Sequence, residues 1–330
     1  MQNVSAEERI ITAFFLCSDS PNKLLEAVRP EWNEKTALSV LEKIAAINYP
    51  GLWAEIFPWA NELSDGVDAP AFSLSHLQQP DLFLRLRPGK EEVVKQKLQA
   101  AEIHFTDITD TCLALPNSSK IDEVIELDKE AVVQDHSSQQ VGIFLQSIQA
   151  ANTKLSVWDC CAASGGKSIM TKDILGEIDL TVSDVRESIM ANLKKRFTIA
   201  GIKGYKSFIT DLAKPVSNLN GRKFDLIIAD VPCSGSGTWG RTPEQLYYFD
   251  EKKIDEYAAL QKKIVTNVIP HLAPDGHLLY ITCSVFKKEN EEAADFIKEK
   301  FHLQLVKMEL LKGYDKKADT MFAALLKKPL

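Results

Sequence analysis

The chain has 330 residues, of which 45% are hydrophobic and 26% charged, and its formal net charge is −7. This composition is ordinary for a globular protein and excludes an intrinsically disordered chain, and the length allows two domains and a large core. The negative charge argues against a protein that coats nucleic acid with a broadly basic surface, although lysine pairs in the second half leave a local basic face open. Residues 1–9 lack the features of a signal peptide, and no apolar stretch approaches membrane-spanning length, so we expect a cytoplasmic protein without membrane contact.

The six cysteines do not form the dense, spaced framework of a small secreted domain. Two of them are neighbours, Cys160 and Cys161, and free thiols in a reducing compartment fit this distribution better than disulfides. No Cys-x-x-Cys or His-x-x-x-His pair supplies the spacing of zinc ligands. The sequence therefore predicts no metal site.

The first part of the chain predicts short helices followed by a small α+β unit. Apolar residues recur at helical spacing over residues 6–60, and the turn formers of residues 64–70 predict a linker. Residues 82–90 then indicate a strand with a turn, residues 91–101 an amphipathic helix, and residues 111–115 a further short strand.

The second part alternates between strands and helices, which is typical of an α/β fold with a mostly parallel sheet. Buried strands are expected at residues 155–160, 178–184, 205–210, 224–230 and 276–283. Helices are expected from about residue 165 and at residues 187–200, 254–272 and 290–301, and residues 303–309 and 321–326 predict a closing antiparallel hairpin. These patterns divide the chain into a helical region (residues 1–70), an α+β subdomain (71–135) and an α/β domain (136–330).

Two turns that contain cysteine close strands of this α/β domain. Cys233 follows the strand that ends at Asp230, and Cys283 follows the strand that ends at Thr282. Ligands of an open parallel sheet bind outside the carboxyl ends of its strands, so both thiols should lie at one crevice. A single cysteine at a strand end is more often a small buried hydrophobe. Two of them at adjacent strand ends predict a site for thiolate chemistry.

The segment from Asp159 to Lys167 lies between a strand and a helix and is rich in small residues. Such a loop lets the backbone approach a ligand and offers free amides to an anionic group, so it predicts a nucleotide-like cofactor. It matches neither the Walker A pattern nor Gly-x-Gly-x-x-Gly. Asp184 ends the next strand and is suited to ribose hydroxyls, and Asp211 could meet an adenine amine. A single aspartate at a strand end is more often a turn or helix cap, but three in succession, with Asp230, favour a site.

With these motifs, the chain resembles the RsmB/Sun/NSUN family of S-adenosylmethionine-dependent RNA (cytosine-5) methyltransferases, and among them the bacterial rRNA enzymes. The family's cofactor loop reads Asp-x-Cys-Ala-Ala-Pro-Gly-Gly-Lys, its fourth motif Asp-Ala-Pro-Cys-Ser-Gly-x-Gly, and its sixth Thr-Cys-Ser followed by Glu-Asn-Glu. They correspond here to residues 159–167, 230–237, 282–284 and 289–291. Ser164 replaces the family's proline and Val231 its alanine. The resemblance covers about residues 80–330, including the upstream Val133–Gln139 segment, and makes residues 1–70 a reduced remnant of a longer NusB-like domain.

The resemblance implies a Rossmann-like class I methyltransferase fold, doubly wound around a mostly parallel seven-stranded sheet. It also implies S-adenosylmethionine as cofactor and RNA as partner, with 16S rRNA preferred and tRNA as the alternative. It assigns the attack on the base to Cys283, product release to Cys233, a shared proton on ring N3 to Asp230, and the positioning of Asp230 and the base to Lys167. The residues by themselves leave open which cysteine attacks. The implied cofactor site comprises Cys161, Ala162, Ala163, Ser164, Gly165, Gly166, Lys167, Asp184, Asp211, Asp230 and Pro232.

The target base must be unstacked to react, which favours a loop or single-stranded region of RNA. Arg85, Arg87 and Lys90 are candidate phosphate contacts, with ordinary surface charge as the alternative, and Trp239 either stacks on a flanking base or packs internally. Two rival functions are a DNA cytosine-5 methyltransferase, which does not need Cys283, and a non-catalytic RNA-binding factor in ribosome assembly. The intact cysteines, Asp230 and glycine loop favour the RNA methyltransferase. Nothing in the sequence specifies an oligomeric state.

Overall fold

The computed structural model describes residues 5–49, 52–148 and 154–330. The first four residues of the N-terminal segment, residues 50–51 of the predicted helical region and residues 149–153 of the predicted α/β domain lie outside this description. Within the described residues, no helix is both long and apolar enough to cross a membrane.

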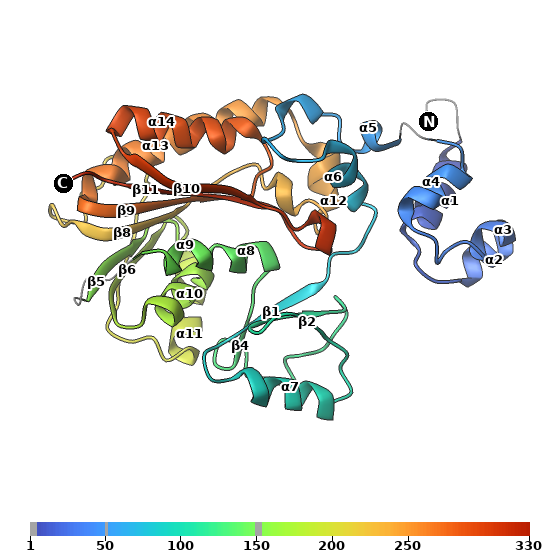
Figure 1. Ribbon diagram of the computed structural model, residues 1–330, viewed down its shortest axis with the longest axis horizontal. Helices are drawn as coiled ribbons and strands as arrows, with labels where there is room; N and C mark the ends of the chain where they lie inside the picture. The colour runs from blue at the N-terminus through green and yellow to red at the C-terminus, as the bar shows by residue number, and fades with distance from the viewer. Residues whose placement is uncertain (1–4, 50–51, 149–153) are drawn as a thin grey trace.

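A seven-stranded sheet in the order β10-β11-β9-β8-β5-β6-β7 forms the centre of the protein (Figure 1). Only β11 runs antiparallel to its neighbours β9 and β10, and the remaining pairs are parallel. The predicted α/β fold class and the closing antiparallel hairpin are therefore confirmed. The strands are β5 (Leu155–Asp159), β6 (Ile178–Asp184), β7 (Lys206–Ile209), β8 (Phe224–Asp230), β9 (Leu272–Thr282), β10 (Gln304–Leu311) and β11 (Met321–Lys327).

Helices cover both faces of the sheet, which explains why the central strands are almost continuously apolar. In Figure 1, α13 and α14 lie along one face, and α9, α10 and α11 along the other. The second group packs on a core that includes Val157, Ile228 and Leu279. These helices are α9 (Gly142–Gln146), α10 (Gly166–Leu175), α11 (Glu187–Ile199), α13 (Lys252–Val268) and α14 (Glu291–Phe301).

The predicted helix over residues 254–272 ends earlier, because Pro270 follows its last turn. α13 stops at Val268, and a 3-10 turn, η3 (Ile269–His271), contains the proline, which lacks the N–H that a continuing helix needs. β9 then begins at Leu272 rather than 276, with a register irregularity against β8 between Phe224 and Leu226.

The α+β unit is a four-stranded sheet in the order β2-β3-β1-β4, with α7 packed against it. The strand within residues 82–90, the helix at 91–101 and the strand at 111–115 are confirmed as β1, α7 and β3. β2 and β4 were not predicted, because one is exposed and the other has only three residues. The bounds are β1 (Leu82–Leu86), α7 (Glu91–Ala100), β2 (Thr106–Thr109), β3 (Cys112–Leu115) and β4 (Ala131–Val133).

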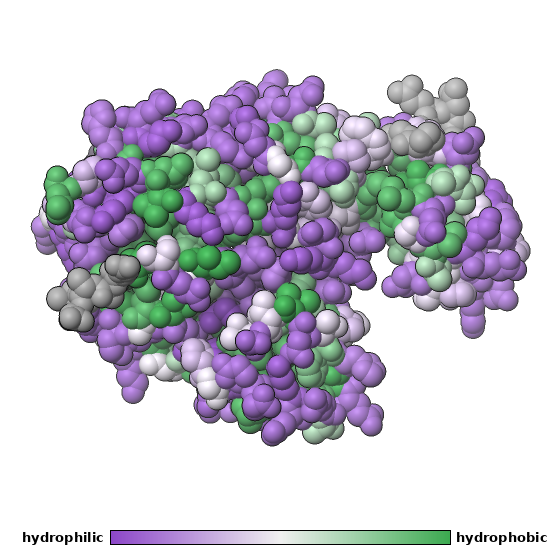
Figure 2. All heavy atoms as spheres, in the orientation of Figure 1, coloured by the Kyte–Doolittle hydropathy of each residue, from purple (hydrophilic) through white to green (hydrophobic). Residues whose placement is uncertain are grey.

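Four short helices form an N-terminal lobe at one side of Figure 1, as the helical periodicity predicts. Side-chain caps define their starts: Ser5 accepts from the Glu8 backbone N–H, and Ser39 and Glu42 form a capping box. In Figure 2, apolar side chains gather on this lobe, which otherwise carries a polar surface. The helices are α1 (Ala6–Cys17), α2 (Lys23–Val28), α3 (Pro30–Asn33) and α4 (Val40–Ala46), and α5 (Leu52–Ile56) follows.

The predicted linker at residues 64–70 is wrong, because the segment packs on the α/β domain and starts a helix. Ser64 is only 3% exposed and its backbone N–H donates to Val285 O at 2.8 Å. Asp68 caps α6 (Ala69–Ser75) by accepting from the Ala71 N–H at 2.9 Å. The turn-forming residues of segment 64–70 thus cap a helix and make a tertiary contact.

Candidate active site

The structure brings the two predicted thiols together at the carboxyl ends of β8 and β9. Because the two strands are adjacent and parallel, the turns that follow them lie side by side, and the Sγ atoms of Cys233 and Cys283 are 3.2 Å apart. The hydrogen bond with Cys283, followed by burial and the charge of Glu289, raises the pKa of Cys233 well above its ordinary value.

Gly237 allows the two cysteine turns to approach each other. Its backbone N–H donates to Cys283 O at 2.9 Å, and its carbonyl accepts from the Thr320 N–H at 2.9 Å. A Cβ at this position would lie 1.9 Å from Thr320 O, so no other residue fits without moving the backbone. The close approach of the Thr320 backbone therefore explains why the fourth motif has a glycine at this position.

Lys167 and Asp230 form an ion pair next to the cysteines. Lys167 stands in the first turn of α10, directly after β5, and Asp230 ends β8; the two meet because β5 and β8 are neighbours where the strand order reverses. Lys167 Nζ is 3.1 Å from Asp230 Oδ2 and 2.8 Å from Ser138 Oγ. Ser138 belongs to α8 (His136–Gln140), so the segment upstream of β5 supports the pair.

The loop between β5 and α10 makes a tight turn at this strand-order switch. Ala163 and Gly165 have positive φ angles of 45° and 87°. A Cβ on Gly165 would lie 2.6 Å from the Phe197 ring, whereas one on Gly166 would meet no atom within 4 Å. Gly165 is thus required for packing, and the loop at Gly166 borders open space.

Hydrogen bonds with neighbouring segments hold two other predicted residues of this loop, Ala162 and Ser164. Ala162 is buried, and its N–H donates to Ser183 O at 2.9 Å. Arg196 Nη1 donates to both the carbonyl and the hydroxyl of Ser164, at 3.0 and 2.9 Å. Cys161 remains partly exposed.

Asp184 lies where the sequence predicted, at the end of β6 and against the loop. Its carboxylate accepts from the Ala163 N–H at 3.0 Å and from the Arg186 N–H at 2.9 Å. Burial raises the pKa of Asp184, but the hydrogen bonds from Arg186 and Ala163 outweigh it and hold the pKa below its ordinary value. Asp184 is therefore an ionised acceptor beside the loop.

Asp211 lies beyond β7 and caps a turn, the alternative that the sequence left open. It accepts from the Ala213 N–H at 3.0 Å and pairs with Lys214 at 3.3 Å, with a side chain that is 42% exposed. The Ala213 hydrogen bond lowers the pKa of Asp211. Pro232, the last predicted residue, accepts from Gln261 Nε2 through its carbonyl at 3.1 Å.

Asp159 lies beneath the loop and is fully buried. Its Oδ2 accepts from Ser168 Oγ at 2.6 Å, whereas its Oδ1 has no hydrogen-bond partner among the residues that the structure describes. Burial, opposed in part by the Ser168 hydrogen bond, raises the pKa of Asp159 to about 7.

Two of the predicted phosphate contacts are structural. Arg85 is 7% exposed, with Nη1 2.7 Å from Asp173 and Nε 2.8 Å from Gln134, so it is not a surface charge either. Arg87 pairs with the same carboxylate of α10 at 2.7 Å. Both arginines join the α+β unit to α10 through Asp173, and Arg87 and Lys90 are each half-buried.

Trp239 packs internally and is fully buried, so the stacking prediction is wrong. Its ring lies among those of Phe57, Phe249 and Phe286, with centroids 6.1, 4.6 and 6.0 Å away. The cluster anchors α12 (Pro243–Tyr248) and the segment around α6 to the α/β domain.

Two exposed aromatic residues near the cysteines were missed. Tyr247 and Tyr248 are 81% and 79% exposed on α12, and a Cβ built on Gly235 of the Cys233 turn would lie 3.7 Å from Gln245 Oε1 of the same helix. Both rings are open to solvent and available to contact a binding partner. In the sequence, the signal that could have identified these two residues was a pair of tyrosines shortly after Pro243, which starts the helix.

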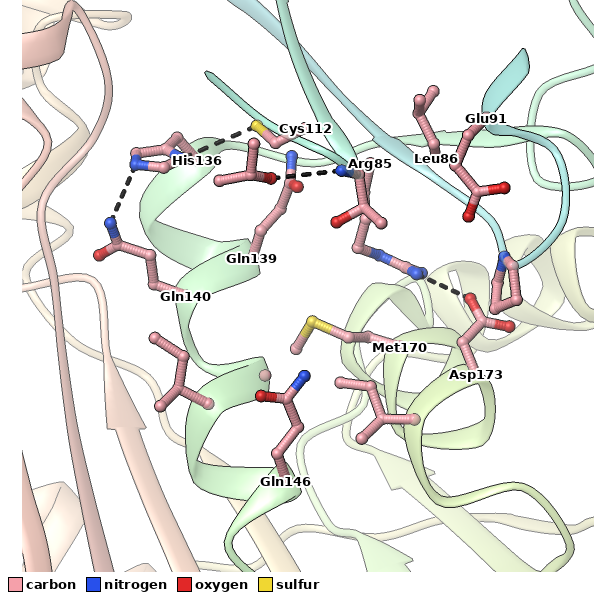
Figure 3. Close-up of a pocket in the computed structure, with 16 residues that line it drawn as sticks. Arg85, Leu86, Glu91, Cys112, His136, Gln139, Gln140, Gln146, Met170 and Asp173 are labelled. Atoms are coloured by element: carbon pink, nitrogen blue, oxygen red, sulfur yellow. Dashed lines mark hydrogen bonds and ion pairs between the residues drawn. The ribbon is translucent and has the colours of Figure 1, made fainter. Parts of the chain in front are cut away.

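A cavity of about 390 Å³ lies apart from this site, between the α+β unit and α8–α10 (Figure 3). Figure 3 shows Arg85 reaching across its wall to Asp173, and His136 between Cys112 and Gln140. None of the predicted catalytic or cofactor residues lines it. In the described part of the chain, no group of three or more histidine, cysteine or acidic side chains is arranged to hold a metal ion.

Comparison with known proteins identifies relatives. The model of the family "16S rRNA methyltransferase RsmB/F" matches residues 146–326, more than half of the chain. Ribosomal RNA small subunit methyltransferase B of Xanthomonas campestris is 28% identical over 234 residues, which cover 68% of this chain and 52% of that protein. The chain thus spans about half the length of this relative.

Two solved structures share the fold. A methyltransferase homolog protein from Pyrococcus horikoshii has a TM-score of 0.68 and 20% identity, covering 87% of this chain and 98% of that one. NSun6 from Pyrococcus horikoshii, solved with SFG, has a TM-score of 0.67 and 14% identity, covering 84% and 96%. At these identities the likeness shows the Rossmann-like fold alone.

Proposed function

Because the chain belongs to the RsmB/F family of 16S rRNA methyltransferases, we propose that it transfers a methyl group from S-adenosylmethionine to carbon 5 of cytosine in RNA, preferentially 16S rRNA. The observation that carries the proposal is the pair of thiols 3.2 Å apart beside the Lys167–Asp230 ion pair. A non-catalytic RNA-binding protein has no use for such an arrangement.

The loop between β5 and α10 fits S-adenosylmethionine. Its small residues and the free backbone N–H groups at the start of α10 suit a nucleotide-like ligand, and open space borders Gly166. Asp184 and Asp211 are the carboxylates that would hold ribose and adenine, and Pro232 would line the site. When bound, the cofactor supplies an electrophilic methyl group.

Cys283 acts as the nucleophile in this proposal. Carbon 5 of cytosine is too weak a nucleophile to take a methyl group, so Cys283 Sγ first adds to carbon 6, and the ring electron pair becomes available at carbon 5. After methylation the carbon 5 proton is lost to a water molecule, the electrons of that C–H bond re-form the double bond between carbons 5 and 6, and the electrons of the carbon–sulfur bond return to Cys283 as it leaves. The Cys233 thiol, at 3.2 Å, is positioned to donate a hydrogen bond to the departing sulfur.

Asp230 and Lys167 control the charge on the ring. Addition of the thiolate builds negative charge at N3, and Asp230 shares a proton with that atom. Lys167 Nζ, 3.1 Å from Asp230 Oδ2, holds the carboxyl group in place, and Ser138 fixes the lysine at 2.8 Å.

The RNA surface proposed here differs from the sequence expectation. Since Arg85 and Trp239 are buried and Arg87 is held in an ion pair with Asp173, Tyr247 and Tyr248 are the better candidates for stacking on unpaired bases next to the target. Lys90 remains a candidate phosphate contact.

The test is to trap the covalent intermediate. Cys233→Ala is incubated with total bacterial RNA and S-adenosylmethionine, resolved on a denaturing gel, and any RNA that stays attached is sequenced. We expect an adduct that is absent from Cys233→Ala/Cys283→Ala and retained in Cys17→Ala/Cys233→Ala, because Cys17 is an exposed cysteine of the N-terminal lobe.

The sequence of the trapped RNA distinguishes the substrates: a 16S rRNA fragment supports the proposal, and a tRNA supports the alternative. If wild type methylates RNA but no adduct forms, the assignment of roles to the two cysteines is wrong. If wild type incorporates no methyl group into RNA or ribosomal particles, the methyltransferase proposal fails.

A further inference from the structure

A buried carboxyl group, Glu289, lies behind the two cysteine turns. It ends the short 3-10 helix η4 (Lys287–Glu289), which packs against α13 and α14, and its side chain is fully buried. No cation pairs with it in the part of the chain that the structure describes, which is unusual for a buried acid.

Hydrogen bonds from both turns replace that cation. The Ser234 N–H, next to Cys233, donates to Glu289 Oε2 at 2.8 Å. The Ser284 hydroxyl, next to Cys283, donates to Glu289 Oε1 at 3.0 Å. One carboxyl group thus joins the two turns whose sulfur atoms are 3.2 Å apart.

The donors to Glu289 Oε2 have fixed directions. A backbone N–H only donates, and Gln261 must present Nε2 to Glu289 at 3.1 Å, because that nitrogen also donates to Pro232 O while Gln261 Oε1 accepts from the Tyr280 hydroxyl. Glu289 Oε2 therefore only accepts, whereas Oε1 faces the Ser284 hydroxyl, which can rotate. Burial raises the pKa of Glu289, and the hydrogen bonds from Ser234, Ser284 and Gln261 oppose it.

The charge of Glu289 acts on Cys233. The hydrogen bond with Cys283 is the largest cause of the raised pKa of the Cys233 thiol, followed by burial and the charge of Cys283, and the charge of Glu289 raises this pKa further. The other titratable groups that face this region are Tyr280 of β9 and the Lys167–Asp230 pair; α13 presents the neutral Gln261, and α14 the neutral Asn290.

We propose that Glu289 is a positioning residue for both cysteines: it holds their turns at reacting distance, and its negative charge keeps Cys233 protonated as the hydrogen-bond donor to Cys283. The inference rests on the proposed methyl transfer for its catalytic meaning. The thiol of Cys233 then stabilises the Cys283 thiolate before attack and as the leaving group after methylation.

The test is the pH dependence of Cys233 alkylation by iodoacetamide, followed by mass spectrometry in a Cys283→Ser background. Since only the thiolate is alkylated, Glu289→Gln should move the reaction to lower pH, by about one unit on removal of one neighbouring charge. Glu289→Asp, which keeps the charge, should leave the pH profile near that of Cys283→Ser. Glu291→Gln makes the same substitution two residues away, at a buried carboxyl that does not face the cysteines, and should not move it.

Methylation kinetics with both cysteines intact test positioning. Glu289→Gln and Glu289→Asp should lower kcat by about 10- to 100-fold with KM for RNA nearly unchanged, as expected for loss of transition-state alignment. Thermal unfolding checks that each variant folds, and Glu289→Asp supplies the kinetic answer if Glu289→Gln does not. An unshifted alkylation profile in a folded Glu289→Gln protein overturns the charge role, and unchanged kcat in either variant overturns positioning. Alkylation needs no RNA, so an inactive wild type would refute the proposed function without deciding this inference.

Discussion

The buried Asp159 makes the stability of the α/β domain depend on pH in a direction opposite to that of most carboxyl groups. Its pKa rises from the ordinary value of 3.8 to about 7, because the fully buried carboxylate loses its hydration. A raised folded-state pKa means that the folded protein binds the proton more tightly than the unfolded chain. The stabilisation is therefore complete below pH 3.8 and is lost as the pH rises through 7.

The size of the effect follows from linkage. With unfolded and folded pKa values of 3.8 and about 7, raising the pH from 5 to 8 should cost about 3 kcal/mol of folding free energy through this group. Asp159→Asn removes the titration. Its oxygen can still accept from Ser168 Oγ, and its NH2 takes the place of Oδ1, which has no partner. The unfolding free energy of Asp159→Asn minus that of wild type should thus be higher at pH 8 than at pH 5, by about that amount.

Urea unfolding at pH 5, 6, 7 and 8, followed by circular dichroism, measures the difference. Asp184→Asn is the matched control, because hydrogen bonds hold the pKa of Asp184 below its ordinary value, so its effect should be constant over this range. If the wild type and Asp159→Asn stabilities stay parallel from pH 5 to pH 8, Asp159 does not titrate near neutrality and the reasoning fails.

Three other substitutions test the site and the corrected contacts. Gly237→Ala would place a methyl carbon 1.9 Å from Thr320 O, so we expect a loss of about 3 kcal/mol or more in urea unfolding and no adduct on the gel; native-like stability would contradict the close approach. Tyr247→Ala/Tyr248→Ala should weaken RNA binding by about 5- to 150-fold, because about 1–3 kcal/mol of stacking is lost, and should leave S-adenosylmethionine binding by calorimetry unchanged. The corresponding Phe variants should retain their RNA affinity. If the Ala variant binds RNA as tightly as wild type, the two tyrosines do not stack on the RNA. Arg85→Met should lower the unfolding free energy by about 2 kcal/mol while RNA affinity changes less than twofold, whereas the reverse result would restore the phosphate contact.

Features that depend on neighbouring residues were predictable from the sequence. The apolar run of β8 ends at Asp230 as expected, because a strand buried on both faces needs a continuous apolar run. The closeness of Cys233 and Cys283 followed from the rule that parallel strands present their carboxyl ends together, and the loop before α10 from its small residues. Each prediction needed only a local pattern and one general property of parallel sheets.

Contacts between distant segments were decided by the tertiary structure alone. Arg85 looked like a surface charge until Asp173, 88 residues further along the chain, was placed against it. Trp239 is a residue type that often stacks on bases, but its ring packs against that of Phe57, which belongs to the segment next to the predicted linker. In the sequence Glu289 is recognisable only as one residue of a motif. Its hydrogen bond from the Ser234 N–H, 55 residues earlier in the chain, appears only in the folded protein.

Hydrophobic periodicity and turn chemistry act over a few residues, so the sequence by itself determined the α/β class, the order of its strands and helices, and the positions of the reactive side chains along the chain. Which polar side chains become buried partners and which stay free to bind depends on the surfaces that pack against them. Those surfaces come from residues far away in the chain, and only folding brings them together.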